Sequence, residues 1–236
     1  MNVLITHEES GTVRQAFRDR GHNAWSCDLV PARDGSKYHV QTEAIAAIML
    51  AKQICRRVKW DLIIMHPECT ALTVAGNHVY AKGKPKHWER LKAVQDIDFL
   101  WKLATKECDR VCMENPQGVI HTNLPHLPKP QYIQPYDFGE DASKKTGLTL
   151  HGLPKLEPTK IIDGRLVCGC GHSFEYGLGV YGCPNCCGDS GPAVERWANQ
   201  TDSGQNRLSP SPTRSRDRSK TYQGIADAMA DQWGGN

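Results

Sequence analysis

The chain has 236 residues and ten cysteines, and its 29 Lys and Arg against 26 Asp and Glu give a formal net charge of +3. No apolar run approaches the roughly 18 residues that a membrane-spanning helix needs, and residues 1–11 lack the basic start and long apolar stretch of a secretory signal. We therefore expect a cytoplasmic protein, in which the cysteines indicate metal binding or catalysis rather than disulfides.

The first half of the chain alternates short apolar segments with amphipathic ones. Strands are predicted at 2–6, 24–28, 61–65 and 110–113, with helices at about 13–21, 42–58 and 88–106. This order predicts an α/β fold with a parallel sheet, in which ligands bind at the carboxyl ends of the strands. The segments HEESG, CDL, HPECT and MENPQG all lie at predicted strand ends. The candidate binding and catalytic residues are therefore expected at that edge of the sheet.

The second half has a different character. Residues 115–160 are rich in Pro and Gly, with one short strand predicted at 131–134. Residues 199–220 lack apolar periodicity and are predicted to form an exposed loop. Helical spacing over 222–233 indicates that the chain then returns to the main domain.

Four cysteines form a metal-binding pattern. Cys168-Gly-Cys170 and Cys183-Pro-Asn-Cys186 are separated by twelve residues, which predicts a structural Zn²⁺ site of zinc-ribbon type within 165–190. Four thiolates leave no open coordination position, so this zinc would supply folding energy rather than catalysis. A set of free thiols is the alternative, and Cys187 and His172 are possible substitute ligands.

Cys69 is the candidate nucleophile. It lies in the loop after the strand 61–65, at the edge of the sheet where ligands bind. By itself a cysteine in such a place is more often an inert, buried small side chain. Glu114 closes the next strand, and because neighbouring strands are about 5 Å apart, the two side chains can face one site. The alternatives for Glu114 are a solvated loop carboxylate and a helix N-cap partner.

In this order the motifs resemble those of the cytosine-C5 DNA methyltransferases, most closely the short members from phage genomes. The family's Pro-Pro-Cys loop and Glu-Asn-Val turn correspond to Pro67-Glu68-Cys69 and Glu114-Asn115-Pro116. The resemblance covers residues 1–118 and 218–236 and implies a Rossmann-like S-adenosylmethionine-dependent methyltransferase core with a small inserted zinc-ribbon module. A phage-encoded member would work in the cytoplasm of a bacterial host.

The resemblance also implies roles for individual residues. Cys69 would add to C6 of a flipped-out cytosine, and Glu114 would protonate or hydrogen-bond N3, so that C5 can accept the methyl group. Asp28 would bind the ribose hydroxyls of the cofactor, and Glu43 its adenine. The remaining cofactor contacts implied are Thr6, Glu9, Ser10, Gly11, Pro67 and, in the C-terminal segment, Ala226.

The same resemblance divides the chain and names a partner. Residues 1–154 and 218–236 would form the catalytic core, and 155–217 a target-recognition region with the zinc ribbon and a basic loop. The expected partner is DNA, read over two to four base pairs by a protein acting as a monomer. Segments 82–92 and 207–220 each carry five cations against one acid, a local charge of +4 that suits phosphate contacts, although a solvated surface is the alternative.

Two departures from the family keep other functions open. Glu68 replaces a proline, and a carboxylate beside Cys69 disfavours the thiolate unless His66 or a lysine compensates. Two arginines of a later family strand are missing, with Lys144 or Lys145 as possible substitutes. The alternatives are a C5-modifying enzyme that acts on RNA or a free nucleotide, and a catalytically weak DNA-binding relative.

Overall fold

The computed structural model describes residues 1–56, 59–175, 183–186, 193–211 and 214–235. The chain divides into two compact units. Unit 1 comprises Met1–Ile133, Lys145–Glu157 and Ala226–Asn236, and unit 2 comprises Gln134–Lys144 and Pro158–Ile225. The functional division into a core and a recognition region stays a prediction. Among the described residues, no helix combines the length and the apolar character needed to cross a membrane.

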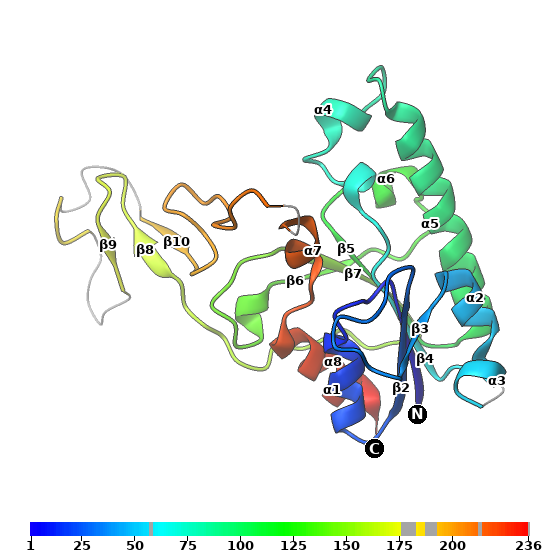
Figure 1. The fold of residues 1–236 in the computed structure, drawn as a ribbon. Coiled ribbons are helices and arrows are strands. Elements are labelled where there is room, and N and C mark those ends of the chain that lie inside the picture. The colour runs from blue at the N-terminus through cyan, green and yellow to red at the C-terminus, as the bar shows by residue number, and fades with distance from the viewer. Residues whose placement is uncertain (57–58, 176–182, 187–192, 212–213, 236) are drawn as a thin grey trace. The chain divides into compact units, whose positions relative to one another are not determined.

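Unit 1 is built on a seven-stranded sheet in the order β3-β2-β1-β4-β5-β7-β6. The strands are β1 (Asn2–Thr6), β2 (Asn23–Asp28), β3 (His39–Gln41), β4 (Leu62–Met65), β5 (Val111–Pro116), β6 (Gln131–Ile133) and β7 (Thr146–His151). Only β7 runs antiparallel to its neighbours. This order with one reversed strand is that of a Rossmann-like methyltransferase fold, which confirms the predicted fold class (Figure 1).

Helices cover both faces of this sheet. The described helices of unit 1 are α1 (Thr12–Asp19), α2 (Ala44–Met49), α3 (Ala51–Ile54), α4 (Asn77–Tyr80), α5 (His87–Glu107), α6 (Ile120–Asn123) and α8 (Gln223–Gly234). Figure 1 shows α2 beside the long α5, and α1 beside α8. Arg20, which follows α1, pairs with Asp227 and Asp231 of α8 and so ties the C-terminal helix to the start of the chain.

The strands are apolar on both faces because helices cover both. Leu4, Ile63 and Met65 pack in one cluster with side chains of α2 and α5. The alternating residues Ile5 and Ile64 are fully buried as well. Burial on both faces is what the continuous apolar runs of a parallel sheet predict.

Two sequence predictions of secondary structure were wrong. The helix expected over 42–58 is interrupted at Leu50, between α2 and α3. In a continuous helix the Ala47 carbonyl would accept the N–H of residue 51, but here it accepts the Trp60 indole N–H at 3.1 Å. The loop expected over 199–220 contains the helix α7 (Arg214–Ser219). The helix expected over 222–233 is confirmed as α8.

Unit 2 has a three-stranded antiparallel sheet in the order β10-β8-β9. Its strands are β8 (Arg165–Val167), β9 (Ser173–Phe174) and β10 (Val194–Arg196). The rings of Tyr136 and Trp197 stack with centroids 4.1 Å apart, and the Trp197 indole donates to the carbonyl of Ile162 at 3.2 Å. This aromatic pair connects the segment 134–144 to the rest of the unit.

One cation of the basic segment 82–92 is a structural residue. Arg90 of α5 is 6% exposed. Its guanidinium donates to the carbonyls of Ala71 (2.7 Å) and Thr73 (3.3 Å) and to the side chain of Asn77 (2.8 Å). Arg90 therefore holds the loop after β4 against α5 and is not a surface contact for phosphate.

The Arg90→Ala substitution should lower the free energy of unfolding by about 2–4 kcal/mol, because three acceptors lose their donor and the buried side chain leaves a cavity. Urea denaturation measures the change. Lys92→Ala, at an exposed position of the same helix, should stay within about 0.5 kcal/mol of the unsubstituted protein. Equal losses for the two variants would show that Arg90 does not hold the loop.

Candidate active site and metal centre

The carboxyl ends of β4 and β5 bring a histidine and a carboxylate together. Met65 of β4 lies opposite both Thr6 of β1 and Met113 of β5, so the residues that follow are neighbours. Nδ1 of His66 lies 2.5 Å from Oε2 of Glu114, with the two side chains 11% and 10% exposed. The predicted site residue Glu114 is therefore held at the sheet edge, by a partner that the sequence reasoning did not identify.

The loop that carries Cys69 is joined to the turn after β5. Thr73 forms a β-bridge with Gly118, and the N–H of Val119 donates to the carbonyl of Leu72 at 2.9 Å. A Cβ atom on Gly118 would lie only 2.1 Å from that carbonyl oxygen, so this close approach requires glycine. Cys69 and Glu114 thus belong to two segments that are fixed to one another.

Cys69 differs from the other cysteines of unit 1 in its exposure. It is partly exposed, and its carbonyl accepts the N–H groups of Leu72 (2.8 Å) and Thr73 (3.1 Å) in the 3₁₀ turn η1 (Thr70–Leu72). The other four cysteines of this unit are buried: Cys27, Cys55, Cys108 and Cys112. Burial raises the pKa of Cys27 to about 12, so that thiol stays neutral.

Glu68 is turned toward the following residue. Its Oε1 accepts the N–H of Thr70 at 2.8 Å and also the Thr70 hydroxyl group. The carboxylate that stands in place of a family proline therefore shapes the turn that begins at Cys69. His66, which the sequence suggested as a cation that offsets Glu68, has its ring in contact with Glu114.

The ends of β1 and β2 gather several of the predicted cofactor residues. Thr6 lies opposite Cys27, which places it next to Asp28, and the side chain of Asp28 accepts the N–H of Val30 at 3.2 Å. Gly11 has φ +73, and a Cβ there would lie 2.2 Å from the Arg14 guanidinium. A carboxylate at the end of β2 suits ribose hydroxyls, so these residues fit S-adenosylmethionine, although the cofactor contacts stay predictions.

The other predicted contacts are more scattered. Ser10 donates to the hydroxyl of Thr12 at 3.2 Å, and Glu9 pairs with Arg33 at 2.6 Å. Glu43 is exposed at the start of α2. Two further contacts are buried: Pro67 in the Cys69 loop and Ala226 in α8.

The sequence reasoning missed the role of Glu8. This side chain is 5% exposed, and its two oxygens accept the N–H groups of Val13 (2.6 Å) and Arg14 (3.3 Å) at the start of α1. Burial raises the pKa of Glu8. An acidic residue shortly before a helix start is the signal that could have identified it.

Unpartnered polar atoms concentrate where β4 and β5 end. Within the described residues, Nε2 of His66 and both side-chain polar atoms of Asn115 are buried without a hydrogen-bond partner. Each such group costs about 1–3 kcal/mol if it stays unsatisfied. A group of them beside Glu114 indicates a place where a ligand or water completes the hydrogen bonding.

The four cysteines of the zinc pattern meet in unit 2. Their sulfur atoms all lie within 4.8 Å of one another, with 3.5 Å between Cys168 and Cys186 and 3.6 Å between Cys170 and Cys183. A tetrahedral site with Zn–S bonds of about 2.3 Å has sulfur atoms about 3.8 Å apart, so the cluster fits zinc. Cys187 lies outside the described residues.

The first pair of ligands sits in the turn of a hairpin. Cys168 and Cys170 lie between β8 and β9, and Gly171 (φ +85) donates its N–H to the carbonyl of Cys168 at 2.9 Å. A backbone N–H of His172 lowers the pKa of Cys170, which favours the thiolate that zinc requires.

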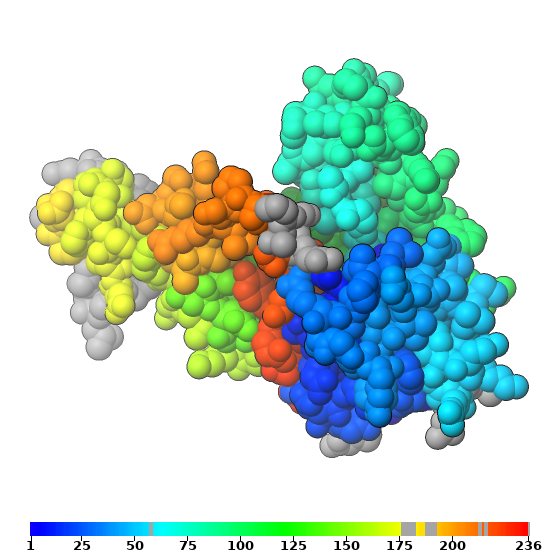
Figure 2. All heavy atoms as spheres, in the orientation of Figure 1, coloured from blue at the N-terminus to red at the C-terminus, as the bar shows by residue number. Residues whose placement is uncertain are grey.

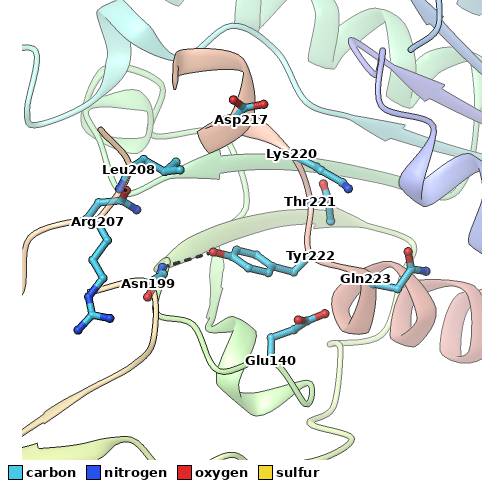
Figure 3. A pocket seen from close by; sticks show the side chains of 10 residues that line it. Glu140, Asn199, Arg207, Leu208, Asp217, Lys220, Thr221, Tyr222 and Gln223 are labelled. Carbon is cyan, nitrogen blue, oxygen red and sulfur yellow. Dashed lines mark hydrogen bonds between the residues drawn. The ribbon is translucent and has the colours of Figure 1, made fainter. Parts of the chain in front are cut away.

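Unit 2 also contains a pocket of about 490 Å³. This volume falls in the range of about 300–1,000 Å³ that is usual for ligand sites. Figure 3 shows the Tyr222 ring in the pocket with its hydroxyl at Asn199, whose amide donates to it at 3.3 Å. Arg207 and Lys220 line the pocket together with Glu140 and Asp217, so it combines an aromatic ring and an amide with side chains of both charges.

A second basic surface lies in unit 1, at the top of Figure 2. Trp88 at the start of α5 is 63% exposed and follows three exposed lysines: Lys82, Lys84 and Lys86. An exposed aromatic ring among lysines is a feature of surfaces that bind nucleic acid.

We expect one zinc ion per chain in the purified protein, and Cys183→Ser should lose it and unfold unit 2, because the metal supplies folding energy to so small a module. Atomic emission and thermal denaturation measure the two effects. The buried thiol of Cys55 provides the control, since Cys55→Ser should keep its zinc. Full zinc content in Cys183→Ser would refute the Cys₄ site.

His7 should make the protein sensitive to acid. Burial lowers the pKa of His7 more than the Asp28 carboxylate raises it, so the unfolded chain binds this proton more readily than the folded one. Stability should therefore fall as the pH drops below about 6.5, and His7→Asn should lose less between pH 7 and 5. Asn tolerates the left-handed backbone (φ 56) at this position.

Chemical denaturation at several pH values measures the difference, with the exposed His78→Asn as control. That control should follow the unsubstituted protein. Parallel pH profiles for His7→Asn and the unsubstituted protein would contradict the assignment.

No protein-family model matches this chain, and no curated protein matches it. Among solved structures, the Entamoeba histolytica methyltransferase EhMeth is similar at 14% identity and a TM-score of 0.49, over 69% of this chain and 58% of that one. The S. pombe Dnmt2 methyltransferase is similar at 16% identity and a TM-score of 0.40 (66% and 51%). A triple mutant of Spodoptera frugiperda DNMT2 is similar at 16% identity and a TM-score of 0.39 (68% and 54%). The chain thus spans between half and three fifths of the length of these structures.

Proposed function

We propose that the chain is an S-adenosylmethionine-dependent methyltransferase that modifies C5 of cytosine in DNA. The observation that carries the proposal is the fixed pairing of two segments at neighbouring strand ends. One contains the partly exposed Cys69, the other Glu114, and the bridge between Thr73 and Gly118 joins them. A thiol and a carboxyl group held at the ligand-binding edge of this fold are what addition to a pyrimidine ring requires.

Each residue has a defined part in the reaction. The Cys69 thiolate adds to C6 of the ring, and Glu114 gives a proton or a hydrogen bond to N3, which makes C5 nucleophilic. S-adenosylmethionine, when bound, supplies the methyl group. The cofactor contacts proposed are Thr6, Glu9, Ser10, Gly11, Asp28, Glu43, Pro67 and Ala226. Because the ring must be reached from its face, a base in a duplex would have to be flipped out.

The basic groups favour a polymer over a free nucleotide. An enzyme that modifies a free nucleotide needs no extended basic surface. This chain has exposed lysines before Trp88 and cations in the unit 2 pocket. Phosphate contacts of this kind give affinity that falls steeply with salt. RNA remains the alternative substrate, and a DNA-binding relative with weak activity is the alternative motivated by Glu68.

Incubation with labelled S-adenosylmethionine and duplex DNA, single-stranded DNA, RNA or deoxycytidine monophosphate tests the proposal. Nucleoside analysis should find 5-methyldeoxycytidine from DNA. Cys69→Ala should reduce the rate by at least about 10³-fold and abolish the covalent complex with DNA that contains 5-fluorocytosine.

Cys55→Ala is the control for thiol loss and should form the complex. A methyl group on N4 of cytosine or N6 of adenine would refute C5 chemistry. Product from RNA alone would keep the chemistry and replace the substrate.

A further inference from the structure

We propose that His66 is the positioning residue for Glu114: its neutral ring, protonated at Nδ1, donates to Oε2 and fixes the carboxyl group that faces the pyrimidine. The inference rests on the proposed function and adds a residue to its mechanism. Its basis is the contact of 2.5 Å between the two groups, both about nine-tenths buried.

The surroundings decide the protonation state of the ring. In an imidazolium both nitrogen atoms carry hydrogen and both need an acceptor. Nε2 of His66 is buried, and within the part of the chain that the structure describes it has no partner. A second N–H there would be a buried donor without a protein acceptor, whereas the neutral ring carries only a lone pair at Nε2 and avoids that cost.

Two ionisable groups in the loop after β1 act on His66 in opposite directions. His7, in the loop after β1, interacts with His66 as a like charge, and a positive His66 would oppose protonation of His7 further. Glu8, from the same loop, interacts with His66 as an opposite charge, and its oxygens also accept the N–H groups at the start of α1. Glu68 directs its carboxylate to Thr70.

A fixed carboxyl group matters in the addition step. As the bond from Cys69 sulfur to C6 forms, the π electrons move toward C5 and N3 takes the proton of the Glu114 carboxyl group. The carboxylate that remains keeps the Nδ1–H of His66 as a donor, which stabilises the new charge. When C5 later loses its proton to solvent and Cys69 leaves, N3 returns its proton to Glu114, so the pair is restored.

The test compares His66→Ala, which removes the donor, with His66→Asn, whose amide N–H can replace Nδ1–H. On DNA with cytosine, we expect kcat of His66→Ala to fall about 10- to 100-fold with little change in KM, and His66→Asn to recover most of it. The profile of kcat against pH should change shape in His66→Ala and keep it in His66→Asn.

A substrate with 5-azacytosine separates positioning from folding. Its ring is more electron-poor, so addition at C6 needs less help from a proton on N3. Adduct formation by His66→Ala should therefore lose less than about threefold on this substrate. The control is His126→Ala, since the exposed His126 also pairs with a carboxylate, that of Asp98, at 2.8 Å, and should leave all these rates unchanged.

Three results would overturn the inference: full activity of His66→Ala, equal losses on cytosine and 5-azacytosine, or a His66→Asn variant as slow as His66→Ala. Thermal denaturation and cofactor binding of both variants detect misfolding. Misfolding would lower the rates on cytosine and on 5-azacytosine equally. If the unsubstituted protein itself forms no adduct and no methylated product, the proposed function fails instead.

Discussion

The close approach of the segments after β4 and β5 is the constraint on which the candidate site depends. Parallel pairing places Met65 opposite Met113, and the next residues are then forced to share a small space. A glycine at 118 lets the Cys69 loop come within hydrogen-bond distance of the turn after β5. Arg90 supports the same loop from α5 through three acceptors. Backbone geometry therefore fixes the loop before any substrate binds.

The core of the fold was predictable because the period of its apolar residues is simple. The runs around Leu4 and Ile63 are apolar on both faces, which only a sheet covered by helices on both sides can accommodate. The elements that sequence reasoning missed lack that signal. β3 has only three residues, and β7 (TGLTLH) contains a glycine and two threonines. The break at Leu50 depends on Trp60, ten residues further along, and no local propensity encodes such a contact.

The candidate site was predictable in its residue types and not in its pairings. Order along the chain placed Cys69 and Glu114 at neighbouring strand ends, since parallel strands end at one edge. The partner of Glu114 could not be predicted, because His66 lies 48 residues away in sequence and no motif links the two. Only the side-chain directions show that Glu68 bends back to Thr70 while His66 reaches across to β5. The residue that follows one strand can therefore pair with a residue near the end of the neighbouring strand, as His66 does with Glu114.

The two units use different physics to become ordered, and this bears on function. Unit 1 buries strands and helices around a large apolar core, whereas unit 2 relies on a small sheet, stacked rings and four clustered thiols. A module with so little core would gain stability from a metal ion at the Cys₄ cluster, so we expect the order of its pocket residues to depend on that ion. In the proposed mechanism the addition step uses Cys69, His66 and Glu114, which all belong to unit 1 and not to the Cys₄ cluster. On that proposal, metal loss would act on what unit 2 binds and not on the addition step.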